Sequence, residues 1–136
     1  MSKRDEVFSL PIRVYFQDTD AGGVVYHASF LNFMERARTE WLRTNGHSNA
    51  GLMKEFGMVF VMRSVKLDYL KPALLDDLLE VTAQIKDIGR SRLTLLQTVR
   101  RGEELLTEAE VHLVCVSLES FKPVSVPEIL RKQWKN

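Results

Sequence analysis

The sequence has 136 residues, of which 45% are hydrophobic and 27% are charged, within the usual range of globular domains. A chain of this length suits one domain with its own core, so residues 1–136 are expected to form a single domain. Nineteen basic and eighteen acidic side chains leave a formal charge of +1. This balance gives no electrostatic reason to expect a nucleic acid or an anionic membrane surface as the main partner.

Cysteine content and hydropathy indicate a cytoplasmic protein. Cys115 is the single cysteine, so no intrachain disulfide can form and a reducing compartment suits the chain. Residues 1–6 are mostly polar and charged, and no apolar stretch follows that is long enough for a signal peptide or a membrane span. We therefore expect a cytoplasmic location and no insertion into a membrane.

The first part of the chain indicates a strand, a loop and a long helix. Alternating apolar and polar side chains predict a strand at Phe8–Phe16, and Pro11 favours its start or the edge of a sheet. Two aspartates and two glycines predict a loop at Asp18–Gly23. From about Ala28 the spacing of apolar residues becomes helical, and Gly46 supplies a stop.

Strands dominate the rest of the chain. A short helix is predicted at Asn49–Phe56, and a helical turn is predicted near the end at Glu128–Trp134. Between them lie four segments whose short connections favour antiparallel hairpins, namely Met58–Tyr69, Leu78–Ile88, Arg92–Arg101 and Leu105–Leu118. This order predicts an α+β fold in which an antiparallel sheet of about five strands wraps around one long central helix.

The segment from Asp18 to Phe30 combines two features that acyl transfer requires. An acidic, glycine-containing loop leads directly into the N-terminus of the long helix. The first N–H groups of a helix lack internal partners and carry a partial positive charge, so they can stabilise the oxyanion of an attacked carbonyl. A carboxylate just before that helix could attack the carbonyl carbon or deprotonate a water that does so.

These residue types alone leave other roles open. Aspartates before a helix usually act as caps or turn residues. A D-x-D pair such as Asp18 and Asp20 also binds metal in nucleotide-sugar enzymes, although the alternating α/β pattern of those enzymes is absent here. The chain has no His or Cys spacing typical of a metal site, so no metal is expected.

Residues 13–31, RVYFQDTDAGGVVYHASFL, and residues 33–42, FMERARTEWL, resemble the motif of the 4-hydroxybenzoyl-CoA thioesterase-like hotdog superfamily. More narrowly, they resemble its YbgC-type acyl-CoA thioesterases, which are encoded with the bacterial Tol–Pal envelope system. The resemblance continues through YLKPA at 69–73, LDD at 75–77 and EAEVHLVCV at 108–116. It implies a hotdog fold and hydrolysis of an acyl-CoA thioester, with coenzyme A as part of the substrate and no other cofactor.

The resemblance also implies roles for individual residues. The second aspartate of the D-x-D is catalytic in the family, which corresponds to Asp20 as nucleophile or general base. The backbone N–H of His27 is implied to bind the thioester oxygen, and the His27 ring is implied to belong to the active site. Phe16 stands where some relatives carry a tyrosine, and the neighbouring Tyr15 is expected to point to the opposite face of the sheet.

Three further residues are candidate contacts for the substrate or its coenzyme A. Tyr26 immediately precedes His27, and packing is an alternative role for it. Arg90 and Ser91 lie in a basic turn between two predicted strands, where arginine suits the phosphates of coenzyme A. A solvated hairpin turn is the alternative interpretation of these two residues.

A homo-oligomer is the expected assembly. The predicted sheet has an open edge, and pairing of such edges is a common way to remove them. The resemblance implies a homodimer or homotetramer with sites between subunits, and an acyl carrier protein is a candidate partner. Two other functions stay open: a hotdog hydratase or dehydratase that acts on an acyl thioester, and a non-catalytic module that binds an acyl carrier or an envelope complex.

Overall fold

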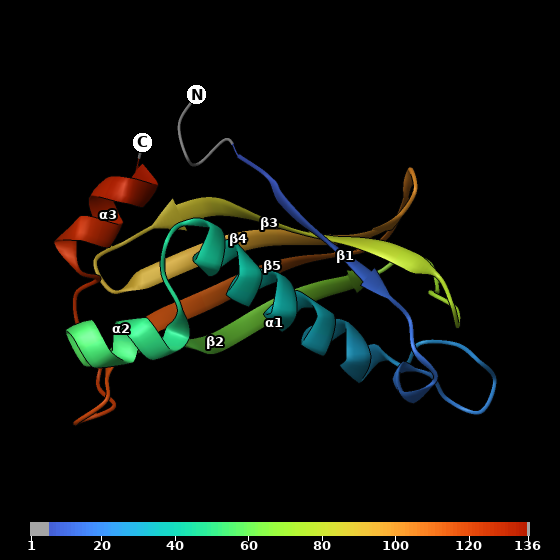
Figure 1. The fold of residues 1–136 in the computed structure, drawn as a ribbon, viewed down its shortest axis with the longest axis horizontal. Coiled ribbons are helices and arrows are strands. Elements are labelled where there is room, and N and C mark those ends of the chain that lie inside the picture. Colours follow the sequence, from blue (N-terminus) through green and yellow to red (C-terminus); the bar gives the residue numbers. More distant parts are fainter. Residues whose placement is uncertain (1–5, 136) are drawn as a thin grey trace.

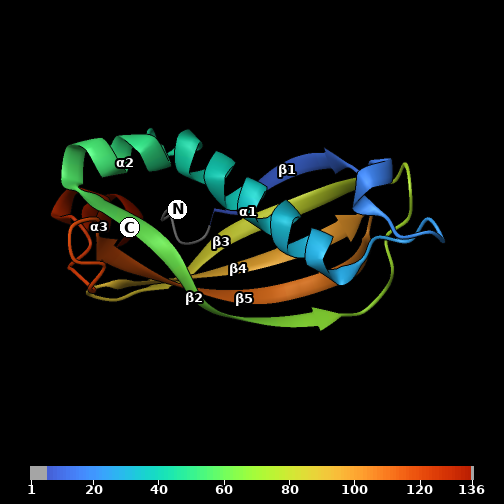
Figure 2. The same ribbon diagram turned by 90° about the horizontal axis from the view of Figure 1, so that it is seen from below.

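The computed structural model describes residues 6–135. Their helices and strands are β1 (Phe8–Arg13), a 3₁₀ turn η2 (Phe16–Asp18), α1 (His27–Thr44), α2 (Asn49–Phe56), β2 (Met58–Tyr69), β3 (Leu78–Ile88), β4 (Arg92–Arg101), β5 (Glu104–Ser117) and α3 (Glu128–Lys135). The strands form one antiparallel sheet in the order β1-β3-β4-β5-β2, which curves around α1 (Figures 1 and 2). The predicted α+β fold, with a five-stranded sheet and a long central helix, is confirmed.

The helix α1 covers the inner face of the sheet with a continuous apolar stripe. Phe30, Phe33, Met34 and Ala37 are buried there, because apolar side chains three or four positions apart share one face of a helix. One buried polar side chain fastens this helix to the sheet: Nε2 of Gln97 in β4 donates to the carbonyl of Met34 at 3.0 Å. The hydrogen bond fixes the position of α1 while satisfying a buried amide.

The strand order corrects the expectation of consecutive hairpins. Although β2 and β3 follow each other in the chain, β2 pairs with β5, and β3 lies between β1 and β4. The connecting segment 70–77 crosses the end of the sheet, and its backbone forms hydrogen bonds with residues near the start of α1. Connection length did not reveal this crossover, because a sheet that curves around a helix lets a short segment pass between strands that are not neighbours.

The first strand ends earlier than predicted. After β1 ends at Arg13, the chain enters the turn η2, in which the carboxylate of the buried Asp18 accepts the N–H of Tyr15 at 2.8 Å. This local hydrogen bond replaces the strand pairing that the alternating pattern predicted. Asp18 therefore acts as a turn and capping residue. The expectation that Tyr15 and Phe16 point to opposite sheet faces is wrong, because both are exposed outside the sheet.

The helices α2 and α3 lie at the other end of the molecule from the start of α1 (Figure 1). At the start of α2, Ser48 Oγ accepts the N–H of Gly51 at 2.9 Å, and the helix ends at Gly57 with a left-handed φ of 63°. Trp134 of α3 is fully buried, and its ring centroid lies 5.1 Å from that of Trp41. In the part of the chain that the structure describes, no helix has the length and apolar character needed to cross a membrane.

Candidate active site

The turn that carries Asp20 is held by hydrogen bonds within its own backbone. The N–H of Asp20 donates to the carbonyl of Val24 at 3.0 Å, and the N–H of Gly23 donates to the carbonyl of Asp20 at 3.1 Å. Gly23 has a φ of 76°, a left-handed conformation that favours glycine. The Oδ1 atom of Asp20 accepts the N–H groups of Gly22 at 2.9 Å and Val24 at 3.4 Å. The turn thus orients the carboxylate.

One oxygen of the Asp20 carboxylate stays available for chemistry. Asp20 is exposed, and its Oδ2 accepts no hydrogen bond from residues 6–135. The carboxylate of Asp18, by contrast, is buried and occupied by the N–H of Tyr15. Of the two aspartates in the D-x-D, Asp20 is therefore the one that can present an oxygen to a substrate or a water.

The helix α1 begins shortly after this turn with a free N–H group. Tyr26 is its N-cap residue and has an extended backbone, with a ψ of 154°. The N–H of Ser29 donates to the carbonyl of Tyr26 at 3.0 Å, whereas the N–H of His27 meets no acceptor among the described residues. The helix start therefore offers a donor and a partial positive charge close to the Asp20 turn.

The ring of His27 stacks on the ring of Tyr69, the last residue of β2. Their centroids are 3.8 Å apart and their planes differ by 11°. The Tyr69 hydroxyl donates to the carbonyl of His27 at 3.2 Å, and the Tyr69 ring meets Phe30 in an edge-to-face contact with centroids 5.6 Å apart. Burial raises the pKa of Tyr69 above its ordinary value near 10, so the hydroxyl remains a donor at neutral pH.

The crossing segment between β2 and β3 fastens the Asp20 turn to the sheet. The N–H of Val25 donates to the carbonyl of Ala73 at 2.9 Å, and the N–H of Leu75 donates to the carbonyl of Gly23 at 2.9 Å. These two hydrogen bonds connect the segment to both sides of Val24. The position of the turn and of the helix start therefore depends on how the segment itself is held.

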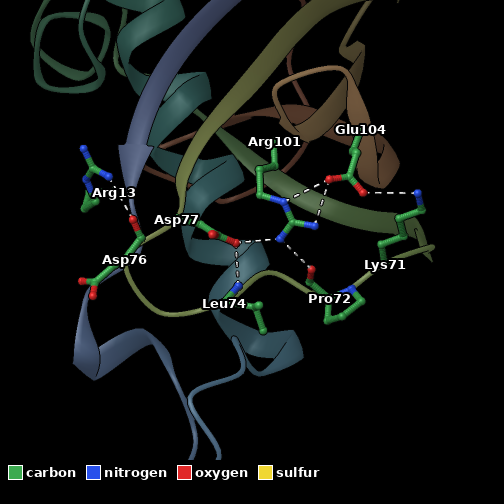
Figure 3. A network of polar contacts seen from close by, with 8 residues as sticks. All are labelled: Arg13, Lys71, Pro72, Leu74, Asp76, Asp77, Arg101 and Glu104. Atoms are coloured by element: carbon green, nitrogen blue, oxygen red, sulfur yellow. Dashed lines mark hydrogen bonds and ion pairs between the residues drawn. The ribbon is translucent and has the colours of Figure 1, made fainter.

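An ion-pair network holds the crossing segment (Figure 3). Oδ2 of Asp77 accepts the N–H of Leu74 at 2.8 Å and a guanidinium N–H of Arg101 at 2.7 Å. Arg101 also donates to the carbonyl of Pro72 at 3.3 Å and pairs with Glu104 at 3.2 Å. The hydrogen bond to Asp77 is the main reason that the pKa of Arg101 lies above its ordinary value. Arg101 thus supports the turn from the end of β4.

Comparison with known proteins gives this arrangement a family. A model of the thioesterase superfamily matches residues 22–108. The acyl-CoA thioesterase YbgC of Haemophilus influenzae is 44% identical over 124 residues, which cover 91% of each chain. The acyl-CoA thioester hydrolase YbgC of Escherichia coli O157:H7 is 45% identical over 130 residues, covering 95% of this chain and 96% of the relative.

The chain belongs to the thioesterase superfamily. The crystal structure of a probable thioesterase from Bartonella henselae agrees with it, with a TM-score of 0.85 and 34% identity over 90% of this chain and 100% of the other. The predicted family and the predicted hotdog fold are thereby confirmed.

In this thioesterase fold, the structure brings three of the five predicted site residues to one end of the sheet. Asp20 and His27 flank the loop that enters α1, and Tyr26 lies beside His27. Tyr26 is partly exposed, and its hydroxyl donates to the carbonyl of Gln17 at 2.9 Å. That hydrogen bond connects the helix start to the turn η2.

The other two predicted residues, Arg90 and Ser91, lie at the opposite end of the sheet. They occupy the turn between β3 and β4, and β3 alone spans roughly 33 Å between its two ends, at about 3.3 Å per residue. Nε of Arg90 donates to Oγ of Ser125 at 2.9 Å, and the rest of its guanidinium is exposed. Arg90 and Ser91 therefore cannot reach Asp20 of their own chain.

The surface beside the Asp20 turn is unusually apolar for an exposed region. A shallow hollow of about 590 Å³ adjoins the turn and is lined by Tyr15, Phe16, Gln17, Leu75 and Asp76. Phe16 is 78% exposed. Exposed aromatic and aliphatic side chains gathered in this way are typical of surfaces that contact a ligand or another protein. Among residues 6–135, no group of three or more His, Cys, Asp or Glu side chains could hold a metal ion.

Sequence reasoning did not single out Tyr69 and Arg101 as parts of this site. Tyr69 appears in the sequence as the first residue of the YLKPA motif, and its contact with His27 joins positions 42 residues apart. Arg101 ends a strand, where a charged side chain is ordinarily solvated. The available signal was the acidic pair Asp76 and Asp77 in a short connection, which needs a basic partner, but only the folded chain shows which one.

Proposed function

We propose that this chain is an acyl-CoA thioesterase, which hydrolyses a thioester to a free acid and CoA. The observation that carries the proposal is the exposed carboxylate of Asp20, oriented through Oδ1 directly before the open N-terminus of α1. The relatives named acyl-CoA thioesterase and acyl-CoA thioester hydrolase, similar over more than nine-tenths of the chain, support the same activity.

The Oδ2 atom of Asp20 acts on the thioester carbon by one of two routes. As a nucleophile, it forms a mixed anhydride while the C–S bond breaks, and a water then hydrolyses the anhydride. As a general base, it takes a proton from a water that attacks the same carbon directly. Both routes consume one water and release CoA as a thiol together with the carboxylic acid.

In either route, negative charge develops on the carbonyl oxygen of the thioester. The free N–H of His27 and the partial positive charge at the start of α1 stabilise this oxyanion. The exposed ring of His27 lies beside the same N–H and supplies a hydrogen bond to the reacting group. Loss of one oxyanion donor lowers kcat by about 10²–10³-fold in other enzymes, which sets the scale expected here.

A second copy of the chain completes the site. The edge strand β2 has 12 residues, and it exposes the apolar side chains of Val61 and Met62. An exposed edge with apolar side chains favours pairing with another strand. When two identical strands pair about a two-fold axis they run antiparallel, so the Met58 end of one β2 lies beside the Tyr69 end of the other.

This pairing gives Arg90 and Ser91 a role that their own chain does not allow. The β3–β4 turn lies at the same end of the sheet as Met58, since Arg92 is opposite Val114 and Met58 is opposite Ser117 on β5. A two-fold dimer therefore brings Arg90 and Ser91 of one subunit toward the Asp20 turn of the other. There the free guanidinium N–H groups bind phosphates of coenzyme A, and Tyr26 contacts the substrate.

The wider setting of the enzyme rests on its resemblance to the YbgC-type thioesterases. On that basis residues 1–136 act as one thioesterase domain in the cytoplasm, and the dimers associate further into a homotetramer. An acyl carrier protein is a candidate partner, and the physiological role lies beside the Tol–Pal envelope system. Coenzyme A enters as part of the substrate, and the mechanism above requires no other cofactor.

Purified protein tests the proposal against its two rivals. The substrates are short aliphatic, long aliphatic, aromatic and enoyl-CoA thioesters, with release of free thiol and loss of enoyl absorbance measured together. We expect thiol release from at least one saturated or aromatic acyl-CoA. Loss of enoyl absorbance without thiol would instead indicate a hydratase. Binding of acyl-CoA with no thiol release from any substrate would indicate a non-catalytic module, and either result contradicts the proposal.

A further inference from the structure

The contact between Tyr69 and His27 lies at the proposed site, and the mechanism above assigns no role to Tyr69. The two rings are nearly parallel, with centroids 3.8 Å apart and planes that differ by 11°. Tyr69 is itself fixed on three sides: by pairing with Thr107 of β5, by the edge-to-face contact with Phe30, and by the hydrogen bond from its hydroxyl to the His27 carbonyl. A well-anchored ring therefore lies against one face of an exposed imidazole.

No hydrogen bond within the described part of the chain fixes the orientation of the His27 ring. Neither ring nitrogen of His27 has a hydrogen-bond partner within the described part of the chain, and the side chain is exposed. An exposed histidine without such a partner ordinarily exchanges between staggered rotamers. In many enzymes a carboxylate or carbonyl orients the imidazole by occupying one nitrogen. At His27, stacking against Tyr69 contacts the face of the imidazole instead. Both ring nitrogens, which lie on the edge of the imidazole, therefore stay free for the substrate.

We propose that Tyr69 is a positioning residue that holds the imidazole of His27 in its reactive orientation by stacking on it. The inference rests on the proposed function and deepens it, because Tyr69 at the end of β2 would then orient His27 at the start of α1. The stack restricts the rotamers of His27, so binding of the substrate does not have to order the ring. The aromatic plane, rather than the hydroxyl, carries this effect.

Two substitutions of Tyr69 distinguish the contribution of its aromatic ring from that of its hydroxyl. Tyr69→Phe is the matched control, since it keeps the ring and removes only the hydrogen bond to the His27 carbonyl. Tyr69→Leu removes the plane while it retains an apolar side chain. We expect Tyr69→Phe to keep kcat within about twofold and Tyr69→Leu to lower kcat by about threefold to tenfold, with KM nearly unchanged, which matches the strength of one aromatic pair.

A double-mutant cycle with His27→Ala distinguishes positioning from a structural role. If Tyr69 acts through His27, Tyr69→Leu changes kcat by less than about twofold once the imidazole is absent. Proton NMR of the His27 ring provides a second readout that needs no catalysis. The ring protons should show an upfield ring-current shift in the wild type and in Tyr69→Phe, and this shift should disappear in Tyr69→Leu. Tyr69→Met replaces Tyr69→Leu if the latter does not fold.

The outcomes separate this inference from the proposed function. An equal loss of kcat from Tyr69→Leu with and without His27 would overturn the positioning role, as would a loss in Tyr69→Phe as large as that in Tyr69→Leu. Full activity of His27→Ala would contradict the role of the His27 ring itself, and the positioning role with it. Absence of thiol release from the wild type would contradict the thioesterase proposal, whatever the NMR spectra show.

Discussion

The two ends of the sheet differ in how they hold their side chains. The helices α2 and α3 lie together at one end of the molecule (Figure 1). There Trp134 and Trp41 are buried, and the ring of Phe60 lies 5.9 Å from that of Trp134. At the end where α1 begins, Asp20 and His27 are exposed and are held by a short backbone turn and one aromatic stack. One end therefore holds these aromatic side chains by burial, whereas the other end leaves the candidate reacting side chains accessible.

Hydrogen bonds at the α3 end reinforce its burial. Gln133 donates to the carbonyl of Asn45 at 2.7 Å and contacts the ring of His47 at 2.8 Å, while Arg131 donates to the carbonyl of Gly89. These contacts connect α3 to the end of α1 and to the β3–β4 turn. A side chain can be held by burial, as at this end, or by local hydrogen bonds that leave it accessible, as at the Asp20 turn.

Trp134→Ala should have the largest effect on stability. It removes a fully buried indole that packs on Trp41 and Phe60, so we expect a loss of about 3–5 kcal/mol in the free energy of unfolding, measured with denaturant. The kcat of the folded fraction at low temperature should stay close to that of the wild type. Trp134→Phe is the matched control. The indole Nε1 is buried without a partner among residues 6–135, so Trp134→Phe breaks no hydrogen bond and should lower the free energy of unfolding less than Trp134→Ala does. If Trp134→Ala lowered kcat without lowering the free energy of unfolding, the proposed difference between the two ends of the sheet would be wrong.

Asp18→Ala should have an intermediate effect on stability. The substitution removes a buried carboxylate and leaves the N–H of Tyr15 without its acceptor within the protein, so we expect the free energy of unfolding to fall by about 1–2 kcal/mol. Asp18→Asn keeps an acceptor oxygen and serves as the control, with a smaller loss in the same thermal or denaturant melt. Equal stability of Asp18→Ala and the wild type would show that this hydrogen bond does not hold the turn.

Glu104→Gln should have the smallest effect, and the effect should depend on pH. Lys71 and Arg101 hold the pKa of the exposed Glu104 below its ordinary value near 4.5. A lowered carboxyl pKa stabilises the folded state fully above the ordinary value, and this contribution is lost as the pH falls through the lowered value. The variant should therefore be slightly less stable than the wild type at about pH 7, and the difference should shrink as the pH falls below the ordinary carboxyl pKa and through the lowered one. A difference that persists in acid would contradict the ion-pair account.

Most elements of the fold could be predicted from the sequence because their patterns are local. The segments Asn49–Phe56, Met58–Tyr69, Leu78–Ile88 and Arg92–Arg101 begin and end at the predicted residues. Two features escaped for physical reasons. The strand predicted as far as Phe16 was cut short by the side chain of Asp18, and the pairing of β2 with β5 depends on the curvature of the whole sheet. Neither the Asp18 hydrogen bond nor the curvature of the sheet changes the spacing of apolar residues from which the elements were predicted.

The candidate site was predictable to the extent that its residues are close in the chain. Asp20, Tyr26 and His27 belong to one continuous motif, and the structure places them at one end of the sheet. Tyr69 and Arg101 come from the ends of two other strands, and no spacing rule connects them to that motif. Arg90 lies at the far end of its own chain, so its role at Asp20 stays a prediction that depends on a second subunit.

The assignment of the reacting carboxylate to Asp20 is tested most directly by comparing it with Asp18, which lies two positions earlier in the chain. The measurement is kcat/KM of the wild type, Asp20→Asn and Asp18→Asn on one acyl-CoA substrate, with the free energy of unfolding of each protein as a control. Asparagine at position 20 keeps an acceptor for the N–H of Gly22, so the turn should persist while kcat/KM falls by roughly 10³-fold. Asp18→Asn should retain kcat/KM within about tenfold of the wild type. Full activity of Asp20→Asn, or an equal loss in Asp18→Asn, would contradict the assignment of the reacting carboxylate to Asp20.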